Sequence, residues 1–201
     1  MVLLASILLG GALNDGYVQS RDYVSALSSR GSTAAFVGIA GLLAFSAAHA
    51  AVGLTMRRYS RGAFVAFELA AVFGVTVALA RIQCPDGAAR CSLDDGVTAD
   101  AFDRLHGLGV IAYEVAFVVG VVAASWWLLR STRRSAVAVG GALILLCMTS
   151  LTLLIVMPDA EPGTVQRAWL LVNSVSIILV AITGSKNSVA HAAMGGSAEN
   201  S

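Results

Sequence analysis

The stretch HGLGVIAYEVAFVVGVVAASWWLL, residues 106–129, decides the fold class of this chain. Its only residues that ordinarily carry charge are His106, at its start, and Glu114. An α-helix needs about 20 mainly apolar residues to cross the roughly 30 Å hydrocarbon core of a bilayer, where its backbone groups must satisfy one another. We therefore predict that this stretch spans a membrane.

Four further segments have the same length and character, and a sixth is shorter. The long ones are residues 33–56, 62–82, 136–157 and 164–183. Residues 1–13 are uniformly apolar but lack the basic start of a signal peptide, so we interpret them as a foreshortened or remnant first transmembrane helix. The fold class expected is all-α, a polytopic bundle of six transmembrane helices within residues 1–184. The small, polar residues 185–201 are predicted to be a disordered tail.

The composition supports a membrane protein and excludes two other classes. Hydrophobic residues make up 57% of the chain and charged residues 12%, and the mean hydropathy is +0.79. Soluble domains contain about 45–50% apolar and about 25% charged residues, so this chain has too little polar surface to be one. The net charge of +1 provides no basic patch for nucleic acid. The expected partner is the lipid bilayer.

Two short connections between the predicted helices suggest the orientation, because they are rich in arginine and contain no acid. They hold Arg57, Arg58 and Arg61, and Arg130, Arg133 and Arg134. Basic connections of this kind stay on the cytoplasmic side. We therefore expect a multi-pass protein of the cell membrane with both termini in the cytoplasm.

Cys84 and Cys91 lie close together in the long polar connection that this orientation places outside. They could close a short disulfide in an oxidising compartment. Free thiols and a metal site are the other readings, and the spacing departs from the close Cys/His pairs that zinc favours. No metal is predicted.

His49 and Glu68 are ionisable residues inside consecutive predicted helices. At 1.5 Å per residue, both lie roughly 10–12 Å from the cytoplasmic border. We expect this inner polar pair to share a hydrogen bond or ion pair. It would be either a structural clasp that sets the helix register or a proton relay, because ionisable groups in a membrane are functional candidates.

A second polar group lies toward the outer side. Glu114 and His106 are candidate acid/base catalysts, with Asp86 and Asp159 beside them in the outer connections. The residues expected to line an outward-facing cavity or its rim are Asp22, Tyr23, Ser25, Ser150, Gln166, Arg167 and Asn173. The alternative is plain packing, in which each hydroxyl bonds its own helix backbone and Glu114 is simply neutral.

No cofactor is predicted. His49 and His106 are expected at different depths, so they cannot both ligate one haem. The phosphate-binding, dinucleotide-binding, nucleophile-elbow and zinc-protease motifs are all missing from the chain. Enzyme classes that carry strong local signatures are therefore not expected.

Several short motifs point to one family. They are the stretch SRDYVSALSSRGS (residues 20–32), Cys84-Pro85-Asp86 with Cys91, His106-Gly107, and Pro158-Asp159 followed by Gln166-Arg167. Together they resemble the prokaryotic six-helix membrane proteins catalogued as domain of unknown function 998, over roughly residues 1–184. The resemblance implies no particular chemistry, but it draws attention to the outer polar positions more than to His49 and Glu68.

Three functions follow from these patterns. We favour a binding or accessory component with an outward-facing polar cavity, whose partner is a hydrophobic small molecule or another membrane protein. The first alternative is a membrane-embedded enzyme that acts on a lipid or isoprenoid-like substrate by acid/base chemistry. The second is a transporter of a small molecule or of protons through His49 and Glu68.

Overall fold

In the computed structural model, the described residues are 2–83, 100–156 and 161–195, and every element found among them is helical. The elements are α1 (Val2–Leu13), the short 3₁₀ helix η1 (Val24–Ser28), α2 (Ala35–Met56), α3 (Arg61–Leu79), α4 (Ala101–Leu129), α5 (Arg134–Val156) and α6 (Pro162–Gly195). Six α-helices with a short first one are what the sequence predicted, and the all-α bundle is confirmed.

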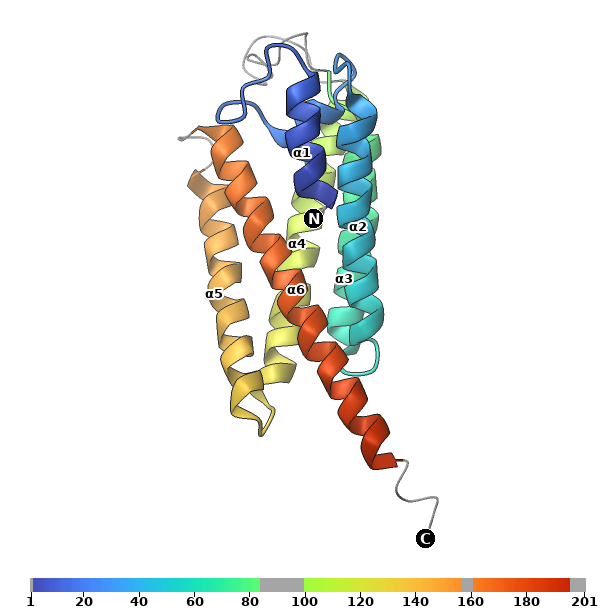
Figure 1. The fold of residues 1–201 in the computed structure, drawn as a ribbon, viewed down its shortest axis with the longest axis vertical. Coiled ribbons are helices and arrows are strands. Elements are labelled where there is room, and N and C mark those ends of the chain that lie inside the picture. Colours follow the sequence, from blue (N-terminus) through green and yellow to red (C-terminus); the bar gives the residue numbers. More distant parts are fainter. Residues whose placement is uncertain (1, 84–99, 157–160, 196–201) are drawn as a thin grey trace.

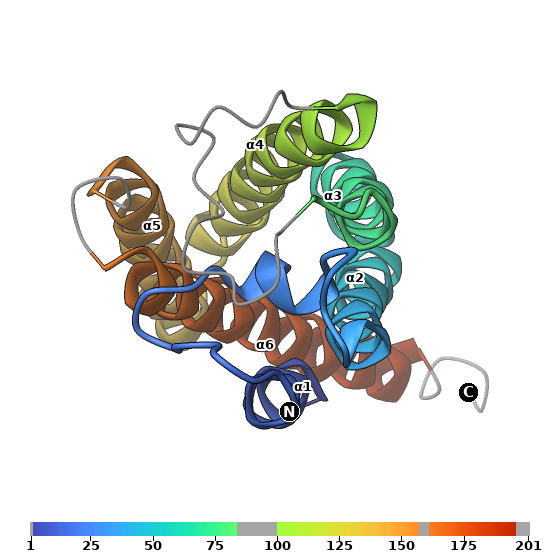
Figure 2. The same cartoon turned by 90° about the horizontal axis from the view of Figure 1, so that it is seen from above.

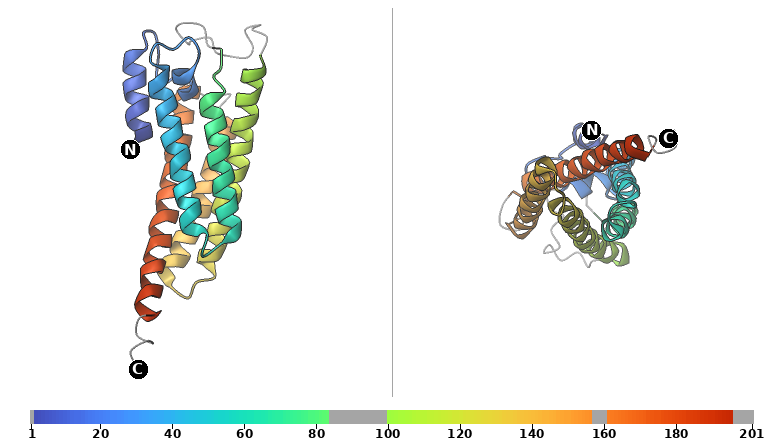
Figure 3. Two further views of the ribbon diagram at one scale, coloured as in Figure 1. Left: turned by 90° about the vertical axis from the view of Figure 1, so that its right-hand side faces the viewer. Right: turned by 90° about the horizontal axis from the view of Figure 1, so that it is seen from below.

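The long helices α2 to α6 run side by side along the long axis of the molecule (Figure 1). Seen from above, they surround a central region, and η1 lies in its mouth as a short blue helix (Figure 2). We call this end of the bundle the η1 end. The opposite end, formed by the turns at residues 57–60 and 130–133, is the arginine end. From the side, α6 continues past the other helices at the arginine end (Figure 3).

The five long helices are long and apolar enough to cross a membrane. Their outward faces carry large apolar side chains that are 65–75% exposed, among them Phe36, Leu108, Leu145 and Ile155. Soluble monomers rarely expose contiguous apolar surface on this scale, whereas a bilayer accommodates it. By contrast, the 12 residues of α1 rise only about 18 Å. In Figure 1, α1 accordingly begins about midway along α2.

Two helices extend beyond the apolar runs that predicted them. α4 begins at Ala101, five residues before the apolar run that starts at His106, because Asp100 caps it. The Asp100 carboxylate accepts from the backbone of Phe102 and Asp103, and the Asp103 carboxylate accepts from the backbone of Asp100. Glu114 is the fourteenth of its 29 residues, near the middle of α4. α6 continues to Gly195, beyond the apolar run that ends at residue 183.

The core lies where α3 and α4 meet α2 and α6. Phe67 on α3 and Phe117 on α4 are completely buried, with Ala70, Val121 and Val180 around them at 0–1% exposure. Small residues let the backbones approach closely in a membrane, where no hydrophobic force draws helices together. This tight contact leaves the open space of the bundle at the η1 end.

Candidate functional site

The segment before α2 turns back into the mouth of the bundle and forms η1. Val24, Ala26 and Leu27 are at most 4% exposed, so the short helix is anchored by apolar side chains. Gly38 on α2 makes the approach feasible, because a Cβ there would lie 2.7 Å from the backbone carbon of Leu27 and 2.9 Å from the backbone nitrogen of Ser28. The short helix therefore forms a roof over the centre of the bundle.

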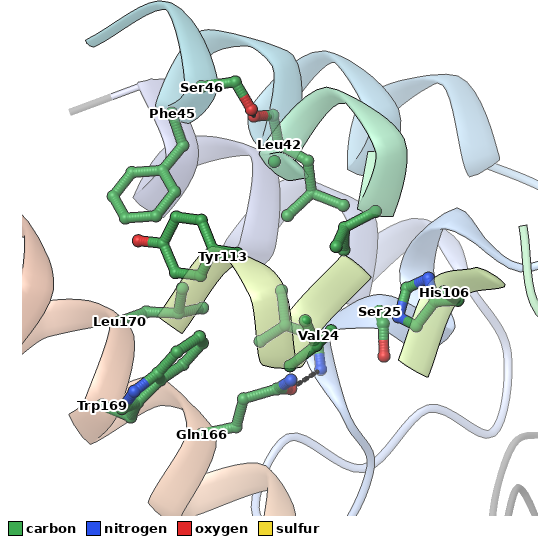
Figure 4. Close-up of a pocket in the computed structure, with 13 residues that line it drawn as sticks. Val24, Ser25, Leu42, Phe45, Ser46, His106, Tyr113, Gln166, Trp169 and Leu170 are labelled. Atoms are coloured by element: carbon green, nitrogen blue, oxygen red, sulfur yellow. Dashed lines mark hydrogen bonds between the residues drawn. The ribbon is translucent and has the colours of Figure 1, made fainter. Parts of the chain in front are cut away.

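A cavity of about 50 Å³ lies beneath this roof. It is lined by Val24 and Ser25 of η1, Leu42, Phe45 and Ser46 of α2, Gly74 and Val77 of α3, His106, Val110 and Tyr113 of α4, and Gln166, Trp169 and Leu170 of α6. Ser25 and His106 lie at one end, whereas Phe45, Tyr113 and Trp169 lie toward the other (Figure 4). The cavity thus has a polar end near η1 and an aromatic end deeper in the bundle.

Hydrogen bonds hold the polar end together. The side-chain oxygen of Gln166 accepts from the backbone of Val24 at 2.5 Å, which ties η1 to α6. Nδ1 of His106 lies 2.9 Å from the carbonyl oxygen of Ala80, which ties α4 to the end of α3. The Ser46 hydroxyl donates to Leu42 of its own helix at 2.9 Å, so it adds little polarity to the wall. Ser25 and the Gln166 amide are the groups best placed to meet a polar atom of a ligand.

Two arginines clamp the chain on either side of η1. Before it, the Arg167 guanidinium donates to the backbone carbonyls of Gln19, Asp22 (3.3 Å) and Gly163 (2.7 Å) and to the hydroxyl of Tyr17 (2.5 Å). Burial raises the pKa of the Tyr17 phenol, so this hydroxyl stays neutral. These bonds fold residues 17–22 against the start of α6.

After η1, the clamp is Arg81 at the end of α3, which donates to the carbonyls of Ser28 (3.0 Å) and Ser29 (2.6 Å). Arg30 then forms an ion pair with Asp100 at 2.7 Å. The Arg30 guanidinium holds the pKa of the Asp100 carboxyl down to about 2. The roof is therefore fastened to α3, α4 and α6.

A second polar group lies between α4, α5 and α6. The Ser150 hydroxyl is 3.0 Å from Oε1 of Glu114 and 2.7 Å from Oδ1 of Asn173. All three side chains are at most 4% exposed. The sequence assigned these residues to one polar group, and the structure brings them together, one from each helix. None of the three lines the cavity.

The inner polar pair does not form, and this prediction needs correction. His49 uses both ring nitrogens elsewhere: Nδ1 lies 2.9 Å from the carbonyl of Phe45, and Nε2 lies 3.0 Å from the hydroxyl of Tyr113. Glu68 lies one turn away against Gly53, and its buried Oε1 has no hydrogen-bond partner. Side chains lean toward the N-terminus of their own helix, so residues at equal depth on antiparallel helices lean apart.

The other candidates are spread over the molecule. Asp22 and Arg167 support the loop before η1, and the carbonyl of Tyr23 accepts from Tyr17 at 3.3 Å. His106 lines the cavity, but Glu114 is eight residues further along α4, about 12 Å away along the axis, so the two do not form one acid/base pair. Four candidates lie outside the described residues: Cys84, Asp86, Cys91 and Asp159.

Sequence reasoning missed the aromatic walls of the cavity. Tyr113 follows His106 by seven residues and Trp169 follows Gln166 by three, so each ring shares a helix face with a predicted polar residue. Helical spacing from the predicted polar residues could have indicated both. Among the described residues, no group of three or more His, Cys, Asp and Glu side chains could hold a metal ion.

The apolar outer faces and the five spanning helices define a multi-pass helical membrane protein with a small interior cavity. The chain belongs to the family described as "Protein of unknown function (DUF998)", whose model matches residues 1–183. The family resemblance read from the short motifs is thereby confirmed. No curated protein and no solved structure matches the chain.

Proposed function

We propose that the protein binds a slender, mainly apolar molecule in the cavity beneath η1. The observation that carries this proposal is the polarity of the cavity, with Ser25 and Gln166 near the roof and the rings of Tyr113 and Trp169 deeper in the bundle. Binding sites for small molecules are typically apolar hollows with a few convergent polar groups. The ligand would place a hydrogen-bonding group near η1 and its apolar part between the aromatic rings.

The size of the cavity limits what it can hold. A single water needs about 10–15 Å³ of cavity volume, and an engineered apolar cavity of about 150 Å³ binds benzene. The cavity of about 50 Å³ therefore suits a molecule of a few heavy atoms or the end of a longer chain. A bulkier ligand would need η1 to move outward. With the arginine end in the cytoplasm, as the charge pattern favours, such a ligand would enter from the outer side.

A catalytic function receives less support. The candidate acid and base lie about 12 Å apart along α4, and they bond different neighbours. His106 bonds the end of α3, and Glu114 bonds α5. No reacting atom could lie within hydrogen-bond distance of both side chains. Binding needs no such pair, and we therefore put it first.

The fluorescence of Trp169 can test the proposal. The chain has three tryptophans, and Trp126→Phe with Trp127→Phe would leave the one that lines the cavity. Straight-chain primary alcohols of increasing length, added to the protein in mild detergent, should change its emission saturably. Each added CH₂ should tighten binding roughly fourfold, from about 0.8 kcal/mol of apolar transfer, until the cavity is full.

A matched pair of variants provides the control. Val110→Phe would fill the cavity, whereas Ile111→Phe, its neighbour on α4, would project from a side chain that is 64% exposed. The saturable response should disappear in the first variant and persist in the second. A response that grows linearly with alcohol and is equal in both variants would show only partition into the detergent, and the binding proposal would fail.

A further inference from the structure

The contact between His49 and Tyr113 lies next to the group of Glu114, Ser150 and Asn173, although the sequence placed His49 and Glu114 in different polar groups. His49 on α2 bonds the Tyr113 hydroxyl at 3.0 Å, and that hydroxyl faces the side-chain amide of Asn173 on α6. Asn173 in turn lies 2.7 Å from the Ser150 hydroxyl on α5. Ser150 also lies 3.0 Å from Glu114. A single series of polar contacts therefore crosses the bundle through α2, α4, α6 and α5.

The direction of the hydrogen bonds in this series follows from its first member. The carbonyl of Phe45 can only accept, so Nδ1 of His49 carries a hydrogen. In a neutral ring, Nε2 is then an acceptor, and the Tyr113 hydroxyl donates to it. The oxygen of Tyr113 is left as an acceptor that faces Asn173, whose Nδ2 has no hydrogen-bond partner within bonding distance.

The same reasoning continues to Glu114. Oδ1 of Asn173 accepts from the Ser150 hydroxyl, which has only one hydrogen to donate. The contact between Ser150 and Oε1 of Glu114 is therefore satisfied only if Glu114 is the donor. A carboxyl group can donate only in its protonated form.

The charges around Glu114 lead to the same conclusion. The titratable groups that face it are Tyr113 on its own helix and Cys147 on α5. α6 contributes Asn173 and Trp169, which do not titrate. Within the described part of the chain, no cation forms an ion pair with Glu114. An unpaired carboxylate in the membrane interior is costly, so the neutral acid is favoured.

We propose that Glu114 is a proton-binding site in the middle of the membrane, and that its carboxyl group donates to Ser150, which in turn donates to Asn173. Beyond Asn173, the series of polar contacts continues through Tyr113 and His49 to the carbonyl of Phe45. This inference goes beyond ligand binding and does not depend on it.

Release of the proton from Glu114 would rearrange the hydrogen bonds at a defined place. The Ser150 hydroxyl would turn to the carboxylate of Glu114, and Oδ1 of Asn173 would lose its donor. The hydrogen bond between α5 and α6 would then be broken. In the alternative, every donor and acceptor in the series is reversed. His49 is then charged, Glu114 is a carboxylate and the Asn173 amide is turned over, which places two charges in the membrane interior.

Infrared spectroscopy of the full chain in lipid vesicles at neutral pH distinguishes these states. A protonated carboxyl has a C=O stretching band separate from the carboxylate bands, and it shifts to lower frequency in D₂O. The wild-type protein should show this band, and Glu114→Gln should lose it. Glu68→Gln is the matched control, because it removes the other membrane carboxyl and should leave the Glu114 band in place.

Two further variants make the test specific to the hydrogen bonds of Ser150 and Asn173. Ser150→Ala removes the acceptor of the Glu114 proton and should shift the band without abolishing it. Asn173→Leu should do the same more weakly, because Asn173 is one bond further away. The proposal is overturned if Glu114→Gln has the same spectrum as wild type in the region of the protonated-carboxyl band. It is also overturned if that variant loses a carboxylate band instead, as the alternative with a charged His49 requires.

Discussion

The contact between Gly38 and η1 leads to the sharpest prediction. A methyl group at Gly38 would lie 2.7 Å and 2.8 Å from the backbone carbon and oxygen of Leu27, whereas ordinary contacts begin at 3.4 Å. The obstacle is backbone, which cannot rotate aside like a side chain, so η1 would have to retreat by about 0.7 Å. Overpacking of this kind costs about 1–3 kcal/mol. Gly38→Ala should therefore destabilise the roof of the cavity.

The control is Gly107→Ala at the same end of the bundle, where an added Cβ meets nothing within 4 Å. Both variants gain the same helix propensity of about 1 kcal/mol, so the difference between them isolates the clash. In thermal unfolding followed by circular dichroism in mild detergent, Gly38→Ala should melt about 2–10 °C below Gly107→Ala. Equal melting temperatures would refute the view that η1 is seated directly on α2.

Two other predictions concern the fastenings of the roof. The pKa of Asp100 is lowered to about 2 from an ordinary 3.8, so its ion pair with Arg30 adds stability above about pH 4 that is lost as the pH falls toward 2. Asp100→Asn should remove this part of the pH dependence of the melting temperature. An unchanged slope of melting temperature against pH would contradict the assignment. Arg167→Lys should lower the free energy of unfolding by about 1–3 kcal/mol, because a single ammonium group cannot reach all the carbonyls to which the guanidinium donates. Denaturant unfolding that matches wild type would show that these hydrogen bonds contribute nothing to stability.

The spans could be predicted because a bilayer imposes one requirement on every segment that crosses it. A helix of about 20 apolar residues satisfies its own backbone, and this property depends on nothing elsewhere in the chain. Boundaries depend on more local chemistry. α4 begins five residues before its apolar run, because its cap is Asp100, an acidic residue of the polar connection.

The candidate site was predicted less well than the spans, because depth along a helix does not determine the neighbour. Counting residues placed His49 beside Glu68, but side chains on antiparallel helices lean apart, and His49 instead meets Tyr113 on α4. Glu114, Ser150 and Asn173 were grouped correctly by depth alone. Depth sufficed there because all three face the same space between their helices.

The sequence by itself determined that this is an apolar bundle of membrane-spanning helices with a few costly polar residues inside it. That conclusion needs only composition and the length of each run, since the bilayer acts on every helix separately. Tertiary structure decided that η1 closes the mouth, that a cavity lies beneath it, and that His49 and Glu114 belong to one series of contacts. These features arise from which helix faces lie against one another, and close packing between particular side chains, not hydropathy, selects those faces.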